Sequence, residues 1–279
     1  MTSKKAICSP TNKNNGYTCY SSKSLLKLRD LWNLRHADAK IKAESPQEIW
    51  KQLKSNMAHI CSTEKCWLRQ EFSKDKLTSE LLSYTFAPTA PDSWKKNPNE
   101  WLSSVDIEAV MKQHEKNMKN FVFIGPSPID FDTQLSYGEC VWDDLCKFKL
   151  EKQIKNGKNK IGFIFNLDPH HKGGSHWIST FIDVKKKYIF FMDSTGDSMP
   201  KQVKKLIDRI IEESRSLNIP LTLHVNKKGH QREDTECGIY SLFVITELLY
   251  EKKTPQHFMD NRIPDEEMEK LRKKYFNLD

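Results

Sequence analysis

Three consecutive apolar segments restrict the fold of this chain more than any other feature. They read KIGFIFNLD, HWISTFIDV and KKYIFFMDS, and their β-branched and aromatic residues predict adjacent central strands. A helix over about residues 235–251 is predicted to be buried, because its stretch GIYSLFVI has almost no polar side chain. Strands mixed with helices in this order predict an α+β fold, with a sheet packed on that helix.

The rest of the chain divides into three parts by composition. Residues 1–22 are polar and are expected to form a disordered tail. Residues 23–95 are expected to form a helical N-terminal region, because SLLKLRDLWNLRHADAKI repeats apolar residues at helical spacing. The proline-rich segment FAPTAPDSWKKNPNEW then predicts a linker or wrapping arm. Residues 96–279 are expected to form the main domain.

Composition restricts the class of protein and its compartment. The chain is 37% hydrophobic and 29% charged, as expected of a soluble globular protein, and it has no apolar run long enough for a membrane span. The N-terminus lacks the apolar region of a secretory signal. The seven cysteines, an odd number, are therefore expected to be reduced thiols in an intracellular, non-secreted protein.

The net charge of +8 admits weak, non-specific contact with nucleic acid or acidic proteins. Lysines are nevertheless scattered over the whole chain. Short runs such as Lys185–Lys187, in a predicted hairpin turn, are more typical of a solvated face than of a binding site.

Four polar residues lie at the ends of the predicted buried elements. Cys237 lies at about the second position of the apolar helix, with Thr235 as the predicted N-cap, and a helix N-terminus favours a thiolate. If Lys185–Lys187 form a hairpin turn, His176 and Asp193 meet at one edge of the sheet. The imidazole then serves as base for Cys237 and the carboxylate orients it, while the amide of Gln231 is placed to donate to an oxyanion.

Each of these residues alone has a simpler interpretation. A cysteine in an apolar helix is usually a core residue, and an aspartate at a strand end usually starts a turn. A histidine before a strand and a glutamine in a polar loop are usually solvated. Only the combination predicts nucleophilic catalysis.

The combination resembles the catalytic signature of the ubiquitin-like (SUMO) protease family, in the clan of the adenovirus protease. That signature is an HW pair, an Asp 17 residues further on, and Q-x5-C-G; here His176 and Asp193 are 17 residues apart, and Gln231 lies six before Cys237. NEWLSSVDIEAVMKQ is similar to the family's W-L-N-D-x-x-I segment. The resemblance covers about residues 99–276.

The resemblance implies a papain-like α+β fold, with a central mixed sheet packed on the buried helix that carries Cys237. It implies that His176 is the general base, Asp193 the orienting acid, Cys237 the nucleophile and Gln231 the oxyanion donor. Trp101 and Trp177 match two aromatic residues that roof a narrow tunnel, which admits only Gly-Gly-like residues before the cut. No cofactor or metal is implied.

The helical N-terminal region and the segments CSTEKCW and ECVWDDLCKF are more similar to the polyprotein-processing proteases of large DNA viruses, including African swine fever virus and mimivirus relatives. SUMO-cleaving members carry an acidic residue three positions after the first tunnel tryptophan, where this chain has Ser104. This departure favours a viral polyprotein substrate, in the host cytoplasm and the virion, over a ubiquitin-like modifier precursor.

Three other functions stay open at this point. They are a deSUMOylating or deubiquitylating isopeptidase, an acyltransferase with the same triad, and a non-catalytic nucleic-acid-binding module. An acyltransferase of this clan usually carries Glu in place of Asp193, and a module without activity has no physical need for all four site residues.

The remaining cysteines and histidines are interpreted as structural. His59, Cys61 and Cys66 have loose spacing for zinc and no evident fourth ligand, so a structural thiol pair is favoured. Further residues are expected in packing or loop positions: Cys140 and Cys146 beside Trp142, His170–His171 in a mobile loop beside the site, and His230 in the loop before Gln231.

Overall fold

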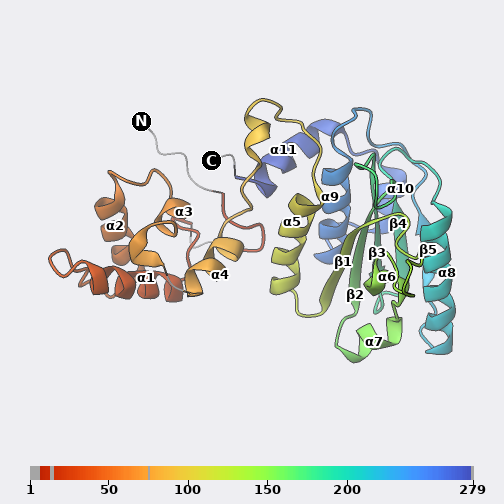
Figure 1. Cartoon of the computed structure of the whole chain (residues 1–279), viewed down its shortest axis with the longest axis horizontal. Helices are drawn as coiled ribbons and strands as arrows, with labels where there is room; N and C mark the ends of the chain where they lie inside the picture. The colour runs from red at the N-terminus through yellow and green to blue at the C-terminus, as the bar shows by residue number, and fades with distance from the viewer. Residues whose placement is uncertain (1–6, 13–15, 75, 278–279) are drawn as a thin grey trace. The chain divides into compact units, whose positions relative to one another are not determined.

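The computed structural model describes residues 7–12, 16–74 and 76–277, and the chain divides into two compact units (Figure 1). The first unit contains Met1–Ala90 and Lys273–Asp279, and the second contains Pro91–Arg272. Both units have their own buried cores.

The N-terminal unit is built from short helices around an aromatic core. Tyr20 stacks on Trp67 and meets Phe86 edge to face, and all three side chains are buried. Asn277 closes the unit from the other end of the sequence, because its side chain exchanges hydrogen bonds with Ile7 and donates one to the carbonyl of Ala87. The elements are α1 (Ser22–Arg35), α2 (Pro46–Met57), α3 (Glu64–Trp67), the 3-10 helix η1 (Glu71–Ser73) and α4 (Lys76–Thr85).

The structure differs from the expected disordered tail over the described part of residues 1–22. Thr18, Cys19 and Tyr20 are at most 2% exposed. The backbone N–H of Cys19 donates to the Glu64 carboxylate. The sequence around these residues is polar, but Tyr20 provides enough apolar surface to anchor the segment in the core.

The second unit is a five-stranded mixed sheet between helices. The strand order is β1-β2-β3-β4-β5, with parallel pairing at the two edges, β1 with β2 and β4 with β5, and antiparallel pairing between β2, β3 and β4. Its strands are β1 (Phe121–Pro128), β2 (Lys160–Asn166), β3 (Trp177–Asp183), β4 (Tyr188–Met192) and β5 (Thr222–Val225). The three apolar segments thus form β2, β3 and β4, side by side as predicted from the sequence.

Helices cover both faces of this sheet. α5 and α9 pack on one face and α8 on the other (Figure 1). α9 is buried over nearly its whole length, which explains why its sequence is apolar on every side. The helices are η2 (Asp92–Lys95), α5 (Ser104–Asn117), α6 (Asp143–Cys146), α7 (Leu150–Lys155), α8 (Lys201–Ser216), α9 (Cys237–Leu249), α10 (Pro255–Asp260) and α11 (Asp265–Tyr275), whose last residues belong to the first unit.

The expectation that all the cysteines are reduced is wrong for six of them. Only Cys237 is a free cysteine, and all seven positions lie among the described residues. The disulfides join Cys8 to Cys19, Cys61 to Cys66 and Cys140 to Cys146. Each pair is close in sequence, and the fold brings the two Cα atoms of each pair to within 5.2–6.3 Å, inside the range that a disulfide spans.

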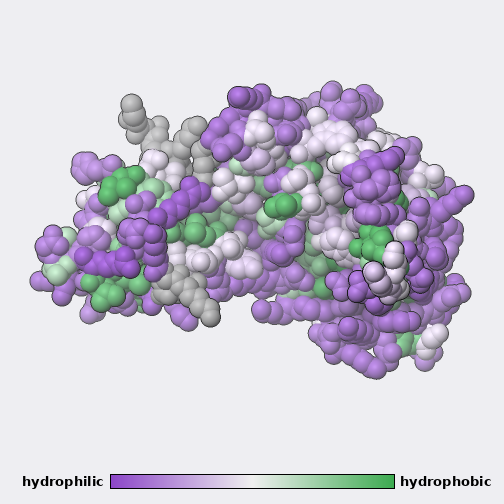
Figure 2. All heavy atoms as spheres, in the orientation of Figure 1, coloured by the Kyte–Doolittle hydropathy of each residue, from purple (hydrophilic) through white to green (hydrophobic). Residues whose placement is uncertain are grey.

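Among the described residues, none of the helices combines the length and the hydropathy that crossing a bilayer requires. Most of the face shown in Figure 2 is hydrophilic, and the hydrophobic residues on it form small, separate patches.

Candidate active site

His176 is held at the end of the loop that connects β2 to β3. The carbonyl of His176 accepts the N–H of Leu167, and Asn166 Oδ1 accepts the N–H groups of Asp168 and Ser175. Gly174 has φ +95°, and a Cβ there would lie 2.7 Å from Asn166 Nδ2, so the loop needs glycine at this position. These contacts fix the backbone from which the His176 imidazole extends.

Asp193 lies at the end of β4, beside His176. The β3–β4 hairpin pairs Ser179 with Met192, so the entry to β3 and the exit from β4 share one edge of the sheet. His176 Nε2 lies 2.9 Å from Asp193 Oδ1. The same oxygen accepts hydrogen bonds from the N–H and hydroxyl of Thr195, at 2.9 and 2.7 Å, so the carboxylate has little freedom to turn away.

Cys237 is the first residue of α9 and is only 1% exposed. Its thiol lies close enough to the His176 ring to raise the pKa of the imidazole. Since Nε2 faces Asp193, the nitrogen that remains for sulfur is Nδ1. The helix begins one residue later than the sequence suggests, with Glu236 rather than Thr235 at the N-cap.

Close packing of Leu102 against Gly238, the residue after Cys237, fixes the position of the start of α9. A Cβ on Gly238 would lie 3.0 Å from the Leu102 Cβ, so only glycine lets the helix start pack against this segment without displacement. The carbonyl of Leu102 in turn accepts the indole N–H of Trp177 at 2.9 Å. Leu102 therefore contacts both the start of α9, through its side chain, and Trp177, through its carbonyl.

The electrostatics of the site favour a charged imidazole. Burial lowers the pKa of His176, but hydrogen bonds and charge interactions with Asp193 and Cys237 outweigh it and raise the pKa to about 10. Burial likewise opposes ionisation of Asp193, yet the bonds from His176 and Thr195 hold its pKa below the ordinary value. An imidazolium between an acid and a thiol can stabilise a thiolate and later protonate a leaving group.

A buried ion pair lies directly before Cys237, and the sequence offers no pattern that predicts it. Glu236 is 1% exposed and contacts Arg272, whose guanidinium stacks on Trp94 and donates to the carbonyl of Glu100. Burial raises the pKa of Glu236, and Arg272 opposes that rise. The two residues are 36 positions apart, and no local pattern marks them as partners.

Gln231 lies in the loop before α9, but its amide is engaged elsewhere. Its Oε1 accepts the Ser194 hydroxyl at 2.7 Å, and its Nε2 donates to the carbonyl of Glu233. The neighbouring His230 is fully buried, and its Nδ1 accepts the N–H of Ile263. Burial lowers the pKa of His230 to about 4, so the ring is neutral and structural.

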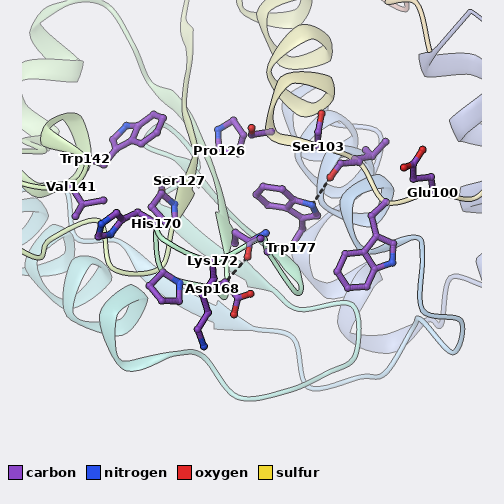
Figure 3. Close-up of a pocket in the computed structure, with 18 residues that line it drawn as sticks. Glu100, Ser103, Pro126, Ser127, Val141, Trp142, Asp168, His170, Lys172 and Trp177 are labelled. Carbon is purple, nitrogen blue, oxygen red and sulfur yellow. Dashed lines mark hydrogen bonds between the residues drawn. The ribbon is translucent and has the colours of Figure 1, made fainter. Parts of the chain in front are cut away.

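A groove of about 620 Å³ passes Trp177 and is lined by residues near the end of β1, in the β2–β3 loop and before α5. Figure 3 shows Trp142, Val141 and His170 toward one end, Ser103 and Glu100 toward the other, and Trp177 between them. Trp101 also lines the groove and is 40% exposed, whereas Trp177 is 7% exposed. Neither His176 nor Cys237 is among its lining residues, but Trp177, which directly follows His176, is one of them.

The cysteines other than Cys237 have structural positions. Cys61 and Cys66 form a disulfide and are not available as zinc ligands. Cys140 and Cys146 are also paired, and their disulfide closes the segment that places Val141 and Trp142 in the groove wall.

Comparison with known proteins settles the class of chemistry. Residues 151–279, which include Cys237, His176 and Asp193, match the profile of the Ulp1 protease family, C-terminal catalytic domain. This segment, less than half of the chain, is similar to that catalytic domain. The protein is a cysteine protease, with the α+β fold that its signature predicts.

Similar viral proteins extend the likeness beyond the Ulp1 domain. R355 of Acanthamoeba polyphaga mimivirus, a protein named for thiol protease activity, is 27% identical over 261 residues, covering 93% of this chain and 84% of that protein. A protein of African swine fever virus (isolate Pig/Kenya/KEN-50/1950), named a SUMO-1 cysteine protease, is 35% identical over 130 residues, covering 46% of this chain and 47% of the relative. The chain thus aligns with about half of that relative's length.

A solved structure has the same fold. The crystal structure of the African swine fever virus protease matches with a TM-score of 0.68 at 22% identity, over 100% of this chain and 98% of that chain. At this level of identity the match shows that the two chains share a fold.

Proposed function

We propose that the protein is an endopeptidase that cuts after Gly-Gly-like sites and processes viral structural polyproteins during virion maturation. The hydrogen-bonded pair of His176 and Asp193, with Cys237 close enough to raise the pKa of His176 and the tryptophan-lined groove beside them, carries this proposal. The viral assignment is supported by the mimivirus and African swine fever virus relatives, which both come from large DNA viruses. The protease would then act in the host cytoplasm and in the virion.

In this proposal Cys237 is the nucleophile and His176 the proton carrier. The thiol proton passes to the imidazole, sulfur attacks the carbonyl carbon before the cut, and the imidazolium protonates the departing amine. A water molecule then attacks the thioester while His176 accepts its proton, and the acid product leaves as the thiol is restored. Asp193 keeps the ring in orientation throughout.

Oxyanion stabilisation is assigned to Gln231 and the start of α9. The first N–H groups of a helix have no intrahelical partner and can donate to a tetrahedral oxyanion. Gln231 Nε2 donates to Glu233, but an amide nitrogen carries two hydrogens, so one stays available for the oxyanion. Loss of one such donor typically costs about 10²–10³ in kcat.

The substrate specificity follows from the two tryptophans. If Trp101 and Trp177 roof a narrow slot, a methyl group at the residue before the cut must displace an aromatic ring. Overpacking of this kind costs roughly 1–3 kcal/mol. We therefore expect Gly→Ala in the substrate to lower the cleavage rate about ten- to a hundredfold.

A peptide series varied at the last two positions before the cut tests this specificity. Trp177→Ala should relax the preference for glycine, with some loss of rate on the Gly-Gly peptide. The Cys237→Ala protein is the control for contaminating protease. Equal cleavage after Gly, Ala and Leu by the unsubstituted protein would rule out the slot while leaving the cysteine protease assignment intact.

An isopeptidase acting on a ubiquitin-like modifier is the second candidate. It is favoured by the name of the African swine fever virus relative, a SUMO-1 cysteine protease, and it would use the same Gly-Gly slot. Ser104, a groove residue in the position of the family's acidic contact, argues against it. Comparing cleavage of polyprotein peptides with cleavage of SUMO and ubiquitin precursors, followed by mass spectrometry of the new N-termini, separates the two.

The N-terminal region and the basic surface have secondary roles in this proposal. Residues 1–95 recognise the substrate or a partner, and residues 96–279 form the catalytic domain. Contact with nucleic acid is limited to weak, salt-sensitive binding, since many surface lysines pair with carboxylates, such as Lys186 with Glu251 and Lys204 with Asp208. A salt titration of DNA binding measures that contact independently of cleavage.

A further inference from the structure

Three side chains near the far end of the groove place ligand atoms close together. Asp130, His170 and His171 each offer one atom, and these atoms all lie within 4.8 Å of one another. This is the one such group of three or more histidine, cysteine or acidic residues in the part of the chain that the structure describes. The proposed hydrolysis uses none of the three.

The carboxylate of this group is held in place by its neighbours in the chain. Asp130 follows β1 between Ile129 and Phe131, which are both buried. The N–H of Ile129 also donates to the carbonyl of Asp168, which ties this segment to the β2–β3 loop that carries the two histidines. The position of the Asp130 carboxylate is therefore set by the core residues on either side of it.

His170 already lies against this carboxylate. Its backbone N–H donates to Asp130 Oδ1 at 2.9 Å, and its Nδ1 lies 2.7 Å from Oδ2. The adjacent His171 ring lies 5.2 Å from the His170 ring between centroids, at an interplanar angle of 85°. The imidazole groups are exposed, so a cation can reach them from solvent.

These distances fit the first coordination sphere of a small metal ion. Zinc–nitrogen and zinc–oxygen bonds are about 2.0–2.2 Å, so two atoms on one tetrahedral ion lie roughly 3.3 Å apart. The Asp130–His170 pair needs to widen by a fraction of an ångström. The His171 ring is exposed and already lies within 4.8 Å of the other two ligand atoms, so a small movement of its side chain brings it into range.

We propose that Asp130, His170 and His171 form a binding site for a divalent transition-metal ion such as Zn²⁺. Two imidazole nitrogens and one carboxylate oxygen are the donors that Zn²⁺ and its neighbours in the first transition row prefer over Mg²⁺ or Ca²⁺. Three protein ligands leave the remaining coordination position to water. The site is separate from Cys237 and does not depend on the function proposed above.

Metal binding would act on the groove through the β2–β3 loop. His170 lines the groove, as do Asp168, Pro169 and Lys172 of the same loop. An ion held between this loop and the end of β1 would fix the groove wall formed by the loop. The ion would lie on the solvent-exposed side of that wall. The bound ion is accordingly expected to reduce cleavage of peptides that extend into this end of the groove.

The test is a titration with Co²⁺, which reports its ligands through visible absorption, followed by displacement with Zn²⁺. It uses the full-length protein with Cys237→Ala, because the active-site thiol would otherwise compete for metal. We expect one Co²⁺ per chain and a spectrum without a thiolate band. His171→Ala should weaken binding at least about tenfold, since even loss of a hydrogen-bond partner of a metal ligand costs 10–100-fold.

Two further variants make the result specific. Asp130→Asn should weaken Co²⁺ binding by a similar factor, and circular dichroism shows whether it remains folded. His59→Ala, at another exposed histidine, should bind as tightly as the parent protein. The proposal is wrong if the parent protein binds no Co²⁺, or if His171→Ala binds it with unchanged affinity.

Discussion

At the residue scale, the site depends on a histidine that stays charged. The pKa of His176 is raised to about 10 by Asp193 and Cys237 together, against the effect of burial. The native state thus retains a proton that the unfolded chain releases near pH 6.5. The stability from this charged group is fully present below about pH 6.5 and is lost as the pH rises through 10.

The first prediction concerns Asp193→Asn, which keeps the shape of the side chain and removes its charge. Without the carboxylate the pKa of His176 falls, so the basic limb of the pH–rate profile should move to lower pH. The rate should also drop, though less than the about 10²–10⁴-fold expected for His176→Ala. Rates of peptide cleavage between pH 5 and 11 measure both effects, and an unchanged basic limb would contradict the assignment of Asp193.

The second prediction concerns Cys237. Cys237→Ala should abolish cleavage and leave the circular dichroism spectrum unchanged, because one sulfur atom is removed from a packed site. Alkylation of the unsubstituted protein, denatured but not reduced, should label one cysteine per chain. After reduction, alkylation should label all seven. Peptide mapping identifies the labelled residue; a label on Cys61 or Cys140 in the unreduced sample would contradict the disulfides.

At the element scale, the start of α9 is located by what packs behind it. Leu102 contacts Gly238 on one side and bonds to Trp177 through its carbonyl on the other. Leu102 therefore links three parts of the site. They are the N-terminus of α9, the end of the loop at His176, and the groove wall. Close packing of this kind transmits small displacements directly to the reactive atoms.

The third prediction is that Gly238→Ala destabilises the catalytic unit by roughly 1–3 kcal/mol, because the new Cβ meets Leu102 at 3.0 Å. Cleavage should fall more than stability alone explains, since Cys237 is displaced with the helix. Urea unfolding and initial rates measure the two quantities.

The matched control is the double variant Gly238→Ala with Leu102→Ala. Removing the Leu102 side chain makes room for the added methyl group, so the double variant should be less destabilised than the sum of the two single changes. Simple additivity in this cycle would show that the contact does not locate the helix.

The sequence predicted the elements that carry a strong local pattern. The segments of β2, β3 and β4, the Lys185–Lys187 turn and the buried α9 were predicted because apolar runs and turn residues are local signals. The capping box of α5, with Ser103 and Asp106, was also predictable from spacing. The geometry at His176 followed from the hairpin register.

Other features depend on contacts that no local pattern encodes. The Glu236–Arg272 pair joins residues from α11 and the N-cap of α9, and each alone resembles a surface charge. The short helices α6, α7 and α10 have four to six residues, too few to establish a periodic pattern. The disulfides were missed because the composition argued for reduced thiols.

At the scale of the whole molecule, the N-terminal unit is discontinuous in sequence. Asn277 is 3% exposed, and its side chain bonds to Ile7 and Ala87, while its backbone bonds to Pro88 and Ala90. Residues near the two ends of the described chain are therefore joined in one unit. The catalytic unit lies between them in sequence, from Pro91 to Arg272.

The fourth prediction is that Asn277→Ala destabilises the N-terminal unit by about 2–5 kcal/mol, because part-buried backbone groups at Ile7 and the buried carbonyl of Ala87 lose their partners. Hydrogen exchange should accelerate at the Ile7 amide, which donates to Asn277, while the amides of α9 keep their protection. Asn261→Ala, at an exposed asparagine, is the control and should change neither. Uniform acceleration across both units would contradict this separation.

The discontinuous unit also has a consequence for biosynthesis. A ribosome adds about 5–20 residues per second, so roughly ten to forty seconds pass while Pro91–Arg272 is translated. During that interval the residues before Ala90 have emerged but lack Asn277. The catalytic unit is therefore fully translated before the N-terminal unit can close. Chaperones that bind the nascent chain encounter the N-terminal unit while it is still open.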